Sequence, residues 1–110
     1  MIRPGQNIAM KVPAHKWADT VAFYRDRVGL TVQKESGETV AFAFGKIVLW
    51  IDKVPHQSQT DIWLELLSDH PDEDLERLGS PRRDTLEPLD GTEGHWTSDP
   101  AGTVLLLRKP

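Results

Sequence analysis

WADTVAFYRDRVGL, residues 17–30, is the stretch around which the rest of the sequence is organised. Its apolar residues recur at helical spacing and form one stripe on an amphipathic helix. The stripe consists of Trp17, Val21, Tyr24 and Val28. Gly29 can adopt the left-handed conformation that ends a helix, and Leu30 can fold back on the last turn. The stretch therefore predicts a helix that packs one face on a sheet and ends at Gly29.

Alternating apolar and polar residues predict strands on both sides of this helix. These strands are Gly5–Val12, Leu30–Lys34, Thr39–Phe44 and Ile47–Asp52. In the first of them, Ile8, Met10 and Val12 share the face that is expected to meet the helix. Residues 53–60, KVPHQSQT, are polar and contain a proline, which predicts a linker. The first half is therefore expected to be a β-α-β-β-β unit.

The second half repeats this order. The predicted elements are a strand at Asp61–Leu67, a short helix that is capped by Ser68 or Asp69 and ends at Gly79, and strands at Arg83–Pro88, His95–Ser98 and Thr103–Arg108. Leu75 and Leu78 share one face of that helix. The sequence thus predicts an α+β fold of two tandem β-α-β-β-β units in a single domain, unit one at about residues 5–54 and unit two at about residues 59–110.

Composition and charge narrow the classes of partner. The chain has 110 residues, no cysteine and a formal net charge of −4, which is concentrated in residues 60–99. The acidic block argues against a nucleic-acid partner and suits either a cationic small ligand, a basic protein surface or plain solvation. The absence of cysteine excludes disulfides, thiolate metal sites and a cysteine nucleophile. With no stretch of ~20 apolar residues and no signal-peptide pattern, we expect a cytoplasmic protein without a membrane partner.

Three stretches resemble the vicinal oxygen chelate superfamily, also called the glyoxalase, bleomycin resistance protein and extradiol dioxygenase superfamily. They are NIAMKV at residues 7–12, AFYRDRVGLTV at residues 22–32 and SDPAGTVLLL at residues 98–107. In the last stretch, Ala101 stands where the family's Asp-Pro-Asp-Gly turn has an acidic residue. The resemblance covers about residues 5–108 and implies curled mixed sheets around a groove for a small ligand.

The resemblance also implies where metal-using members place their ligands. One ligand lies near the start of the first strand of each unit and one in its last strand, which here gives Asn7, Trp50, Asp61 and Leu106. Only Asp61 is an ordinary metal ligand, because an indole and a leucine cannot donate a lone pair to a divalent ion. We therefore expect no metal at these positions and no cofactor.

The candidate binding residues share the strand faces that point away from the expected helix contacts. Leu49 and Ile51, and Ile62 and Leu64, are expected to pack on the helices, so the indoles of Trp50 and Trp63 point the other way. Aromatic rings of this kind can stack on a planar compound, hold a cation, or fill the groove themselves. The full set of predicted ligand-binding residues is Asn7, Trp50, Asp61, Trp63, Glu65, His95 and Leu106.

The sequence carries no nucleophile elbow, phosphate loop or dinucleotide motif, so it favours a binding protein over an enzyme. We expect a metal-independent small-molecule binding protein that resembles the bleomycin-resistance branch, works as a homodimer and holds an aromatic or cationic compound. One alternative is a metal-dependent lyase, isomerase or dioxygenase of the same superfamily with displaced ligands, for which Asp61, Glu65 and His95 are the candidates. The other is a non-catalytic interaction protein whose groove is filled by its own side chains.

Overall fold

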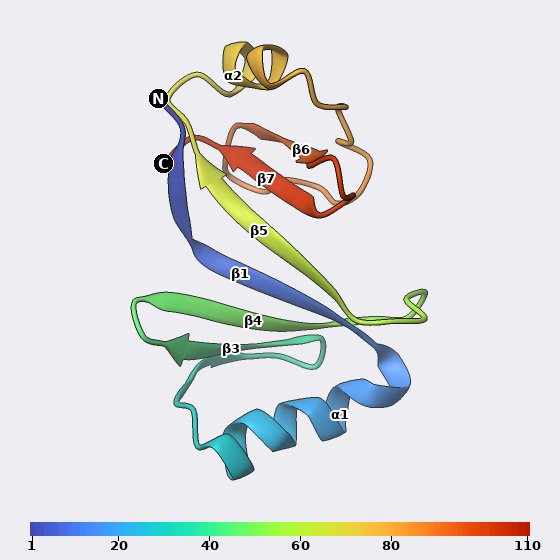
Figure 1. Ribbon diagram of the computed structural model, residues 1–110. Helices are drawn as coiled ribbons and strands as arrows, with labels where there is room; N and C mark the ends of the chain where they lie inside the picture. Colours follow the sequence, from blue (N-terminus) through green and yellow to red (C-terminus); the bar gives the residue numbers. More distant parts are fainter. The chain divides into compact units, whose positions relative to one another are not determined.

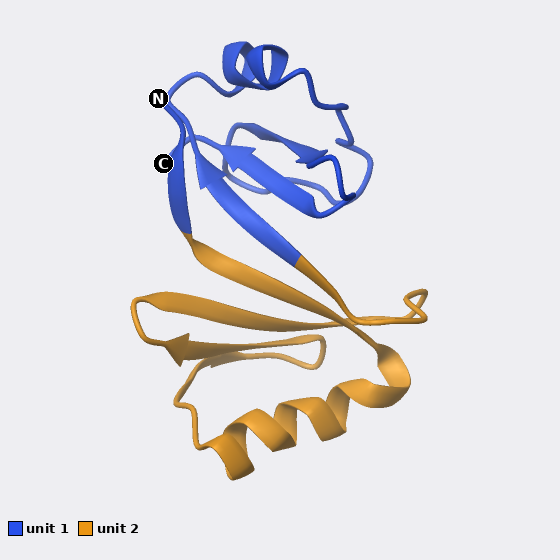
Figure 2. Ribbon diagram, viewed as in Figure 1, with its two compact units in different colours: residues 1–5, 63–110 blue, residues 6–62 orange.

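The computed structural model describes all residues from Met1 to Pro110 and confirms the α+β prediction. The elements are β1 (Arg3–Pro13), α1 (Ala14–Ala22), the π-helical η1 (Phe23–Val28), β2 (Val32–Glu35), β3 (Thr39–Phe44), β4 (Ile47–Val54), β5 (Asp61–Leu67), α2 (Pro71–Leu78), β6 (Gly94–Ser98) and β7 (Val104–Arg108) (Figure 1). They form two compact units, unit 1 with residues 1–5 and 63–110 and unit 2 with residues 6–62 (Figure 2). Neither α1 nor α2 combines the length and apolar character that crossing a bilayer requires.

Unit 2 is a mixed sheet with the strand order β2-β3-β4-β1, in which β1 runs parallel to β4 and the other pairs are antiparallel. The helical segment α1–η1 packs on one face of this sheet. The core between them consists of Val12, Val21, Val40, Phe42, Leu49 and Ile51, with Ile8 and Met10 packed against it. The predicted orientation of the first strand is therefore confirmed.

The helix of unit 2 ends at Gly29 as predicted. Gly29 has φ 84°, and the amide of Leu30 donates to the Tyr24 carbonyl over 3.0 Å. The prediction for Val28 was wrong, because its side chain is 51% exposed. Residues 23–28 form a π-helix, which holds more residues per turn than an α-helix and rotates Val28 off the apolar stripe.

Unit 1 contains the strand order β5-β7-β6, with β5 parallel and β6 antiparallel to β7. Helix α2 packs on β6 and β7. The prediction that Ile62 and Leu64 of β5 pack on a helix was wrong, because both are exposed. With only eight residues, α2 is too short to extend its cover over β5.

The strand predicted at Arg83–Pro88 is absent, so unit 1 lacks one strand of the predicted repeat. This segment lies beside β6 as an irregular chain. The amide of Arg83 donates to the Trp96 carbonyl over 2.7 Å, and the Trp96 amide donates to the Asp84 carboxylate over 2.9 Å. A side chain thus replaces a backbone acceptor in the ladder, and Pro88 supplies no amide hydrogen.

Candidate functional site

The sheet face of unit 2 that points away from α1 carries three rows of side chains. Strand register places Asn7 beside Val48 and Ala43, Ala9 beside Trp50 and Ala41, and Lys11 beside Asp52 and Thr39. Successive rows on one face lie about 7 Å apart along the strands. The face therefore presents an indole between two small side chains, with a charged row next to it.

Trp50 is the largest side chain of this face. Its indole N–H donates to the Asn7 amide oxygen over 2.8 Å, and the side chain is partly exposed. Its lateral neighbours in the strand register are Ala9 and Ala41, whose side chains end at Cβ. A ring held in this way is suited to stacking.

The charged row was missed by the sequence interpretation. Lys11 is 3% exposed, and its Nζ donates to Asp52 Oδ2 over 2.7 Å. The Thr39 hydroxyl donates to the other oxygen of the same carboxylate. Strand alternation could have found this row, because Lys11 shares a face with Asn7 and Asp52 shares one with Trp50.

The corresponding face of unit 1 is filled by its own side chains. Trp63 is 9% exposed and Trp96 is 7% exposed, and their rings meet edge to face with centroids 5.1 Å apart. Glu65 lies beside Leu106 in the strand register and accepts a hydrogen bond from Arg108 Nε over 2.8 Å. A Cβ at position 5 would come within 2.2 Å of Glu65 Oε1, so the carboxylate requires Gly5.

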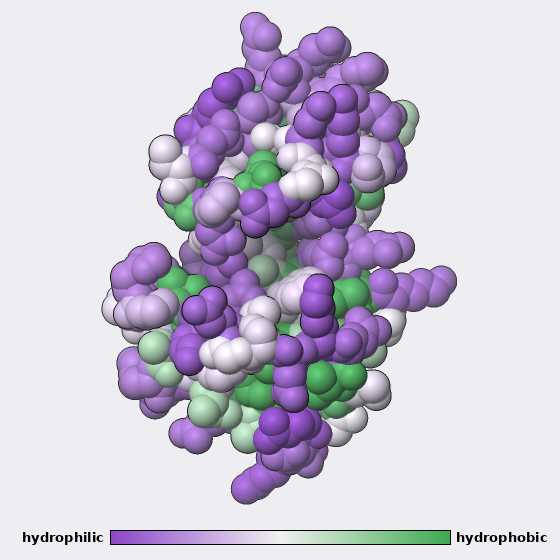
Figure 3. Space-filling model, turned by 180° about the vertical axis from the view of Figure 1, so that it is seen from behind, coloured by the Kyte–Doolittle hydropathy of each residue, from purple (hydrophilic) through white to green (hydrophobic).

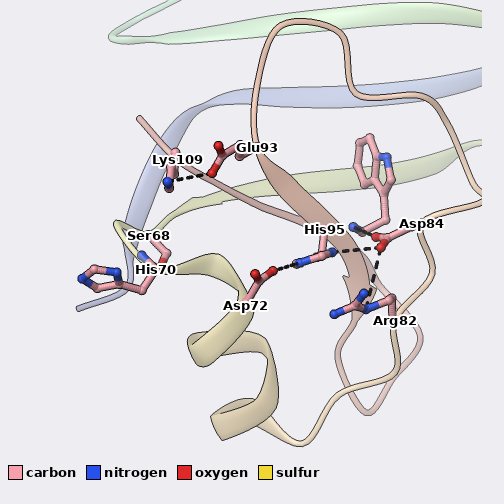
Figure 4. Close-up of polar contacts among 9 residues, drawn as sticks. Ser68, His70, Asp72, Arg82, Asp84, Glu93, His95 and Lys109 are labelled. Atoms are coloured by element: carbon pink, nitrogen blue, oxygen red, sulfur yellow. Dashed lines mark hydrogen bonds and ion pairs between the residues drawn. The ribbon is translucent and has the colours of Figure 1, made fainter.

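His95 lies on the other face of the unit 1 sheet. It is paired with Leu107 in the strand register, whereas Leu106 is paired with the neighbouring Trp96. Its imidazole lies between Asp72 of α2 and Asp84, where the Nδ1···Asp84 Oδ2 distance is 2.8 Å (Figure 4). The imidazole therefore faces α2, so it does not join Glu65 and Leu106.

The predicted binding residues thus form separate groups. Asn7 and Trp50 are joined by a hydrogen bond in unit 2, and Asp61 begins β5 at the end of the same unit. Trp63, Glu65 and Leu106 share one face in unit 1. The partners that sequence reasoning missed are Lys11, Asp52, Trp96 and Arg108, together with Asp72 and Asp84 at His95.

The residues at the positions of the family's metal ligands do not fit a metal ion. The Asn7 amide oxygen accepts the indole N–H of Trp50, and neither Trp50 nor Leu106 offers a lone pair of its own. No group of three or more histidine and carboxylate side chains is arranged to hold a metal ion. The two carboxylates at His95 bind opposite nitrogens of the ring, so the three groups do not converge on one point.

Neither a family profile nor a curated protein matches the sequence. Solved structures do match. A glyoxalase/bleomycin resistance protein/dioxygenase superfamily member from Vibrio splendidus is 12% identical, with a TM-score of 0.65 and full coverage of both chains. A hypothetical protein from Bacillus halodurans is 10% identical, with a TM-score of 0.68, covering 99% of this chain and 94% of that one.

A third structure is homoprotocatechuate 2,3-dioxygenase from Brevibacterium fuscum, which is 18% identical with a TM-score of 0.63. The match covers 98% of this chain but only 36% of the dioxygenase. At these identities the likeness establishes the fold. The chain has the vicinal oxygen chelate fold, the fold of the glyoxalase, bleomycin resistance protein and dioxygenase superfamily.

Proposed function

We propose that the chain is a metal-independent small-molecule binding protein, similar in kind to the bleomycin-resistance branch of its superfamily, which holds an aromatic or cationic compound against Trp50. The observation that carries this proposal is the placement of Trp50. Its indole is fixed by Asn7 and flanked by Ala9 and Ala41. An aromatic surface with a few placed polar groups provides affinity and orientation.

The charged row supports the same function. Lys11 and Asp52 lie one row away from Trp50, so a compound stacked on the indole would have its polar end about 7 Å away, beside the partly exposed Asp52 carboxylate. The positions of the family's metal ligands hold Asn7, Trp50 and Leu106, and these side chains do not fit a metal ion, which supports metal-independent binding. In a solved structure, the Brevibacterium fuscum enzyme of this fold holds 3,4-dihydroxyphenylacetate, which is aromatic.

Isothermal titration calorimetry with three probe classes tests this function. The probes are 3,4-dihydroxyphenylacetate, benzamidine as an aromatic cation and cyclohexanecarboxylate as a matched compound without an aromatic ring. At least one aromatic probe should bind, and Trp50→Ala should weaken it threefold to thirtyfold, the equivalent of ~0.5–2 kcal/mol for one stacking or cation–π contact. Addition of a chelator should leave the affinity unchanged.

Trp17→Phe is the matched control, because the Trp17 indole donates to the Ile51 carbonyl and packs on the α1 side of the sheet. This variant should keep the affinity of the unchanged protein. Three results would contradict the proposal: no binding by either aromatic probe at millimolar concentration, equal affinity of the Trp50→Ala variant, or stoichiometric zinc, iron, manganese or nickel in protein purified without a chelator.

We also propose that the working form is a homodimer. Three large apolar side chains of unit 2 are about half exposed, namely Phe23, Val28 and Phe44. Figure 3 shows apolar side chains gathered on part of the surface of unit 2. Exposed apolar surface of this kind is typical of protein interfaces.

A further inference from the structure

His95 joins three parts of unit 1. It lies in β6, while Asp72 belongs to the first turn of α2 and Asp84 to the segment between α2 and β6. Both ring nitrogens contact a carboxylate, Nε2 with Asp72 and Nδ1 with Asp84 (Figure 4). Only the protonated imidazolium carries a hydrogen on each nitrogen, so this arrangement belongs to the charged form of the ring.

The two carboxylates are held to different degrees. Asp84 also accepts the backbone amide of Trp96 over 2.9 Å, and Arg82 Nε lies 3.8 Å from its second oxygen. The side chain of Asp72 is 86% exposed and makes its hydrogen bond to His95. The Asp84 contact is therefore fixed by the surrounding backbone, whereas Asp72 can turn into water.

We propose that His95 is a pH-sensitive clip that ties α2 to β6 when the ring is protonated and releases Asp72, while keeping Asp84, when the ring loses its proton. A neutral imidazole has one N–H and one lone pair. The hydrogen stays on Nδ1 because the Trp96 amide holds Asp84 in place, and the bare Nε2 then faces Asp72, which it repels.

Release of Asp72 removes the tie between the first turn of α2 and His95 of β6. That turn borders a hollow of about 140 Å³ whose other wall contains Glu93, Gly94 and Lys109. Lys109 Nζ pairs with Glu93 over 2.7 Å, and the hollow is also lined by Asp69, His70 and Glu73. The cationic groups that act on Asp72 are His95, Arg82 and Lys109. The clip thus sets the position of the Asp72 side chain at the edge of the hollow.

The electrostatic surroundings of His95 decide how the contribution of the clip to stability changes with pH. Burial lowers the pKa of His95, but the hydrogen bonds that the ring donates to Asp72 and Asp84, together with the charge of Asp84, outweigh it, so the pKa lies above its ordinary value of 6.5. Because the folded state holds the proton more tightly, the contribution of the clip to stability is complete below pH 6.5 and is lost as the pH rises through the raised pKa.

An NMR titration of the full chain tests the clip. The ring nitrogens of His95 should titrate with a midpoint above 6.5, and the basic form should be the Nδ1–H tautomer. The backbone amide of Asp72 should shift with the same midpoint, while the amide of Trp96 keeps the shift of a hydrogen-bonded group. An Nε2–H tautomer, a midpoint at or below 6.5, or an unresponsive Asp72 amide would each overturn the proposal.

Two variants separate the clip from a general charge effect. Asp72→Asn removes the released partner and should lower the His95 midpoint. Glu73→Gln removes the same charge from the next residue of the same turn, whose side chain is exposed, and should leave the midpoint almost unchanged. Equal shifts in the two variants would show that the field of α2, rather than the contact with Asp72, sets the titration, and the clip would be refuted.

Discussion

Trp50 and Trp63 both point to the sheet face opposite the helices, yet their surroundings differ. Trp50 lies between two alanines and is partly exposed. Trp63 packs against Trp96, whose indole N–H donates to the Glu87 carbonyl over 2.9 Å. Strand alternation decides which face a side chain takes, but the side chains that cover that face decide whether it binds a ligand or belongs to the core.

Trp63→Ala should therefore destabilise the folded protein. Removing a buried indole and its ring contact should lower the free energy of unfolding by ~3–5 kcal/mol. Trp50→Ala should cost less than half of that, because the ring is partly exposed and stands between small side chains. Urea denaturation followed by circular dichroism measures both values. If Trp50→Ala proved the more destabilising of the two, Trp50 would be a core residue and the binding proposal would lose its main support.

At the residue scale, the sequence could predict which face of the sheet a side chain takes, but not which other side chains it contacts. The Asn7–Trp50 pair and the Lys11–Asp52 row follow from alternation once the parallel pairing of β1 with β4 is known. The contacts of His95 do not follow from any local pattern, since Asp72 and Asp84 lie 23 and 11 residues away in the sequence. Their meeting depends on how α2 packs over β6.

At the element scale, the best-predicted features are those fixed by local backbone chemistry. The strands Thr39–Phe44 and Asp61–Leu67 have the predicted bounds, and both helices end at a glycine with positive φ. The prediction of a strand at residues 83–88 was wrong, because the Asp84 carboxylate and an irregular stretch of backbone make the hydrogen bonds to the edge of β6. Such a replacement of a backbone partner by a side chain leaves no trace in the alternation pattern.

The end of η1 gives a prediction at this scale. Gly29→Ala should lower the free energy of unfolding by ~1 kcal/mol, because a residue with a Cβ is strained at φ 84°. A Cβ at position 29 would meet no atom within 4 Å, so the cost comes from the backbone alone. Gly37→Ala is the matched control, since position 37 is equally open and lacks a positive φ. Chemical denaturation of both variants measures the difference, and equal stabilities would contradict the backbone explanation.

At the scale of the whole molecule, the acidic block of residues 60–99 has a largely structural use. Six of its twelve carboxylates are tied within unit 1 by the pairs Glu65–Arg108, Asp69–Arg3, Asp72–His95, Asp74–Arg77, Asp84–His95 and Glu93–Lys109. Asp99 accepts the amides of Ala101 and Thr103 in the turn before β7. Net charge counted along a sequence therefore overstates the charge that is left for a cationic partner.

The proposed homodimer gives the prediction for the whole molecule. Light scattering at micromolar concentration should give twice the 12.4 kDa mass of one chain. A stable interface buries ~1,200–2,000 Å² and places apolar side chains at its centre, a role that suits Phe23 and Phe44 of unit 2. Phe23→Arg or Phe44→Arg should then raise the dimer dissociation constant at least tenfold, because an arginine at the centre of an apolar interface is buried without a partner.

Leu78→Arg, at a similarly exposed position of unit 1, is the control and should leave the dimer dissociation constant unchanged. A monomeric mass for the unchanged protein, or a stronger effect of Leu78→Arg than of both phenylalanine variants, would refute an interface through unit 2.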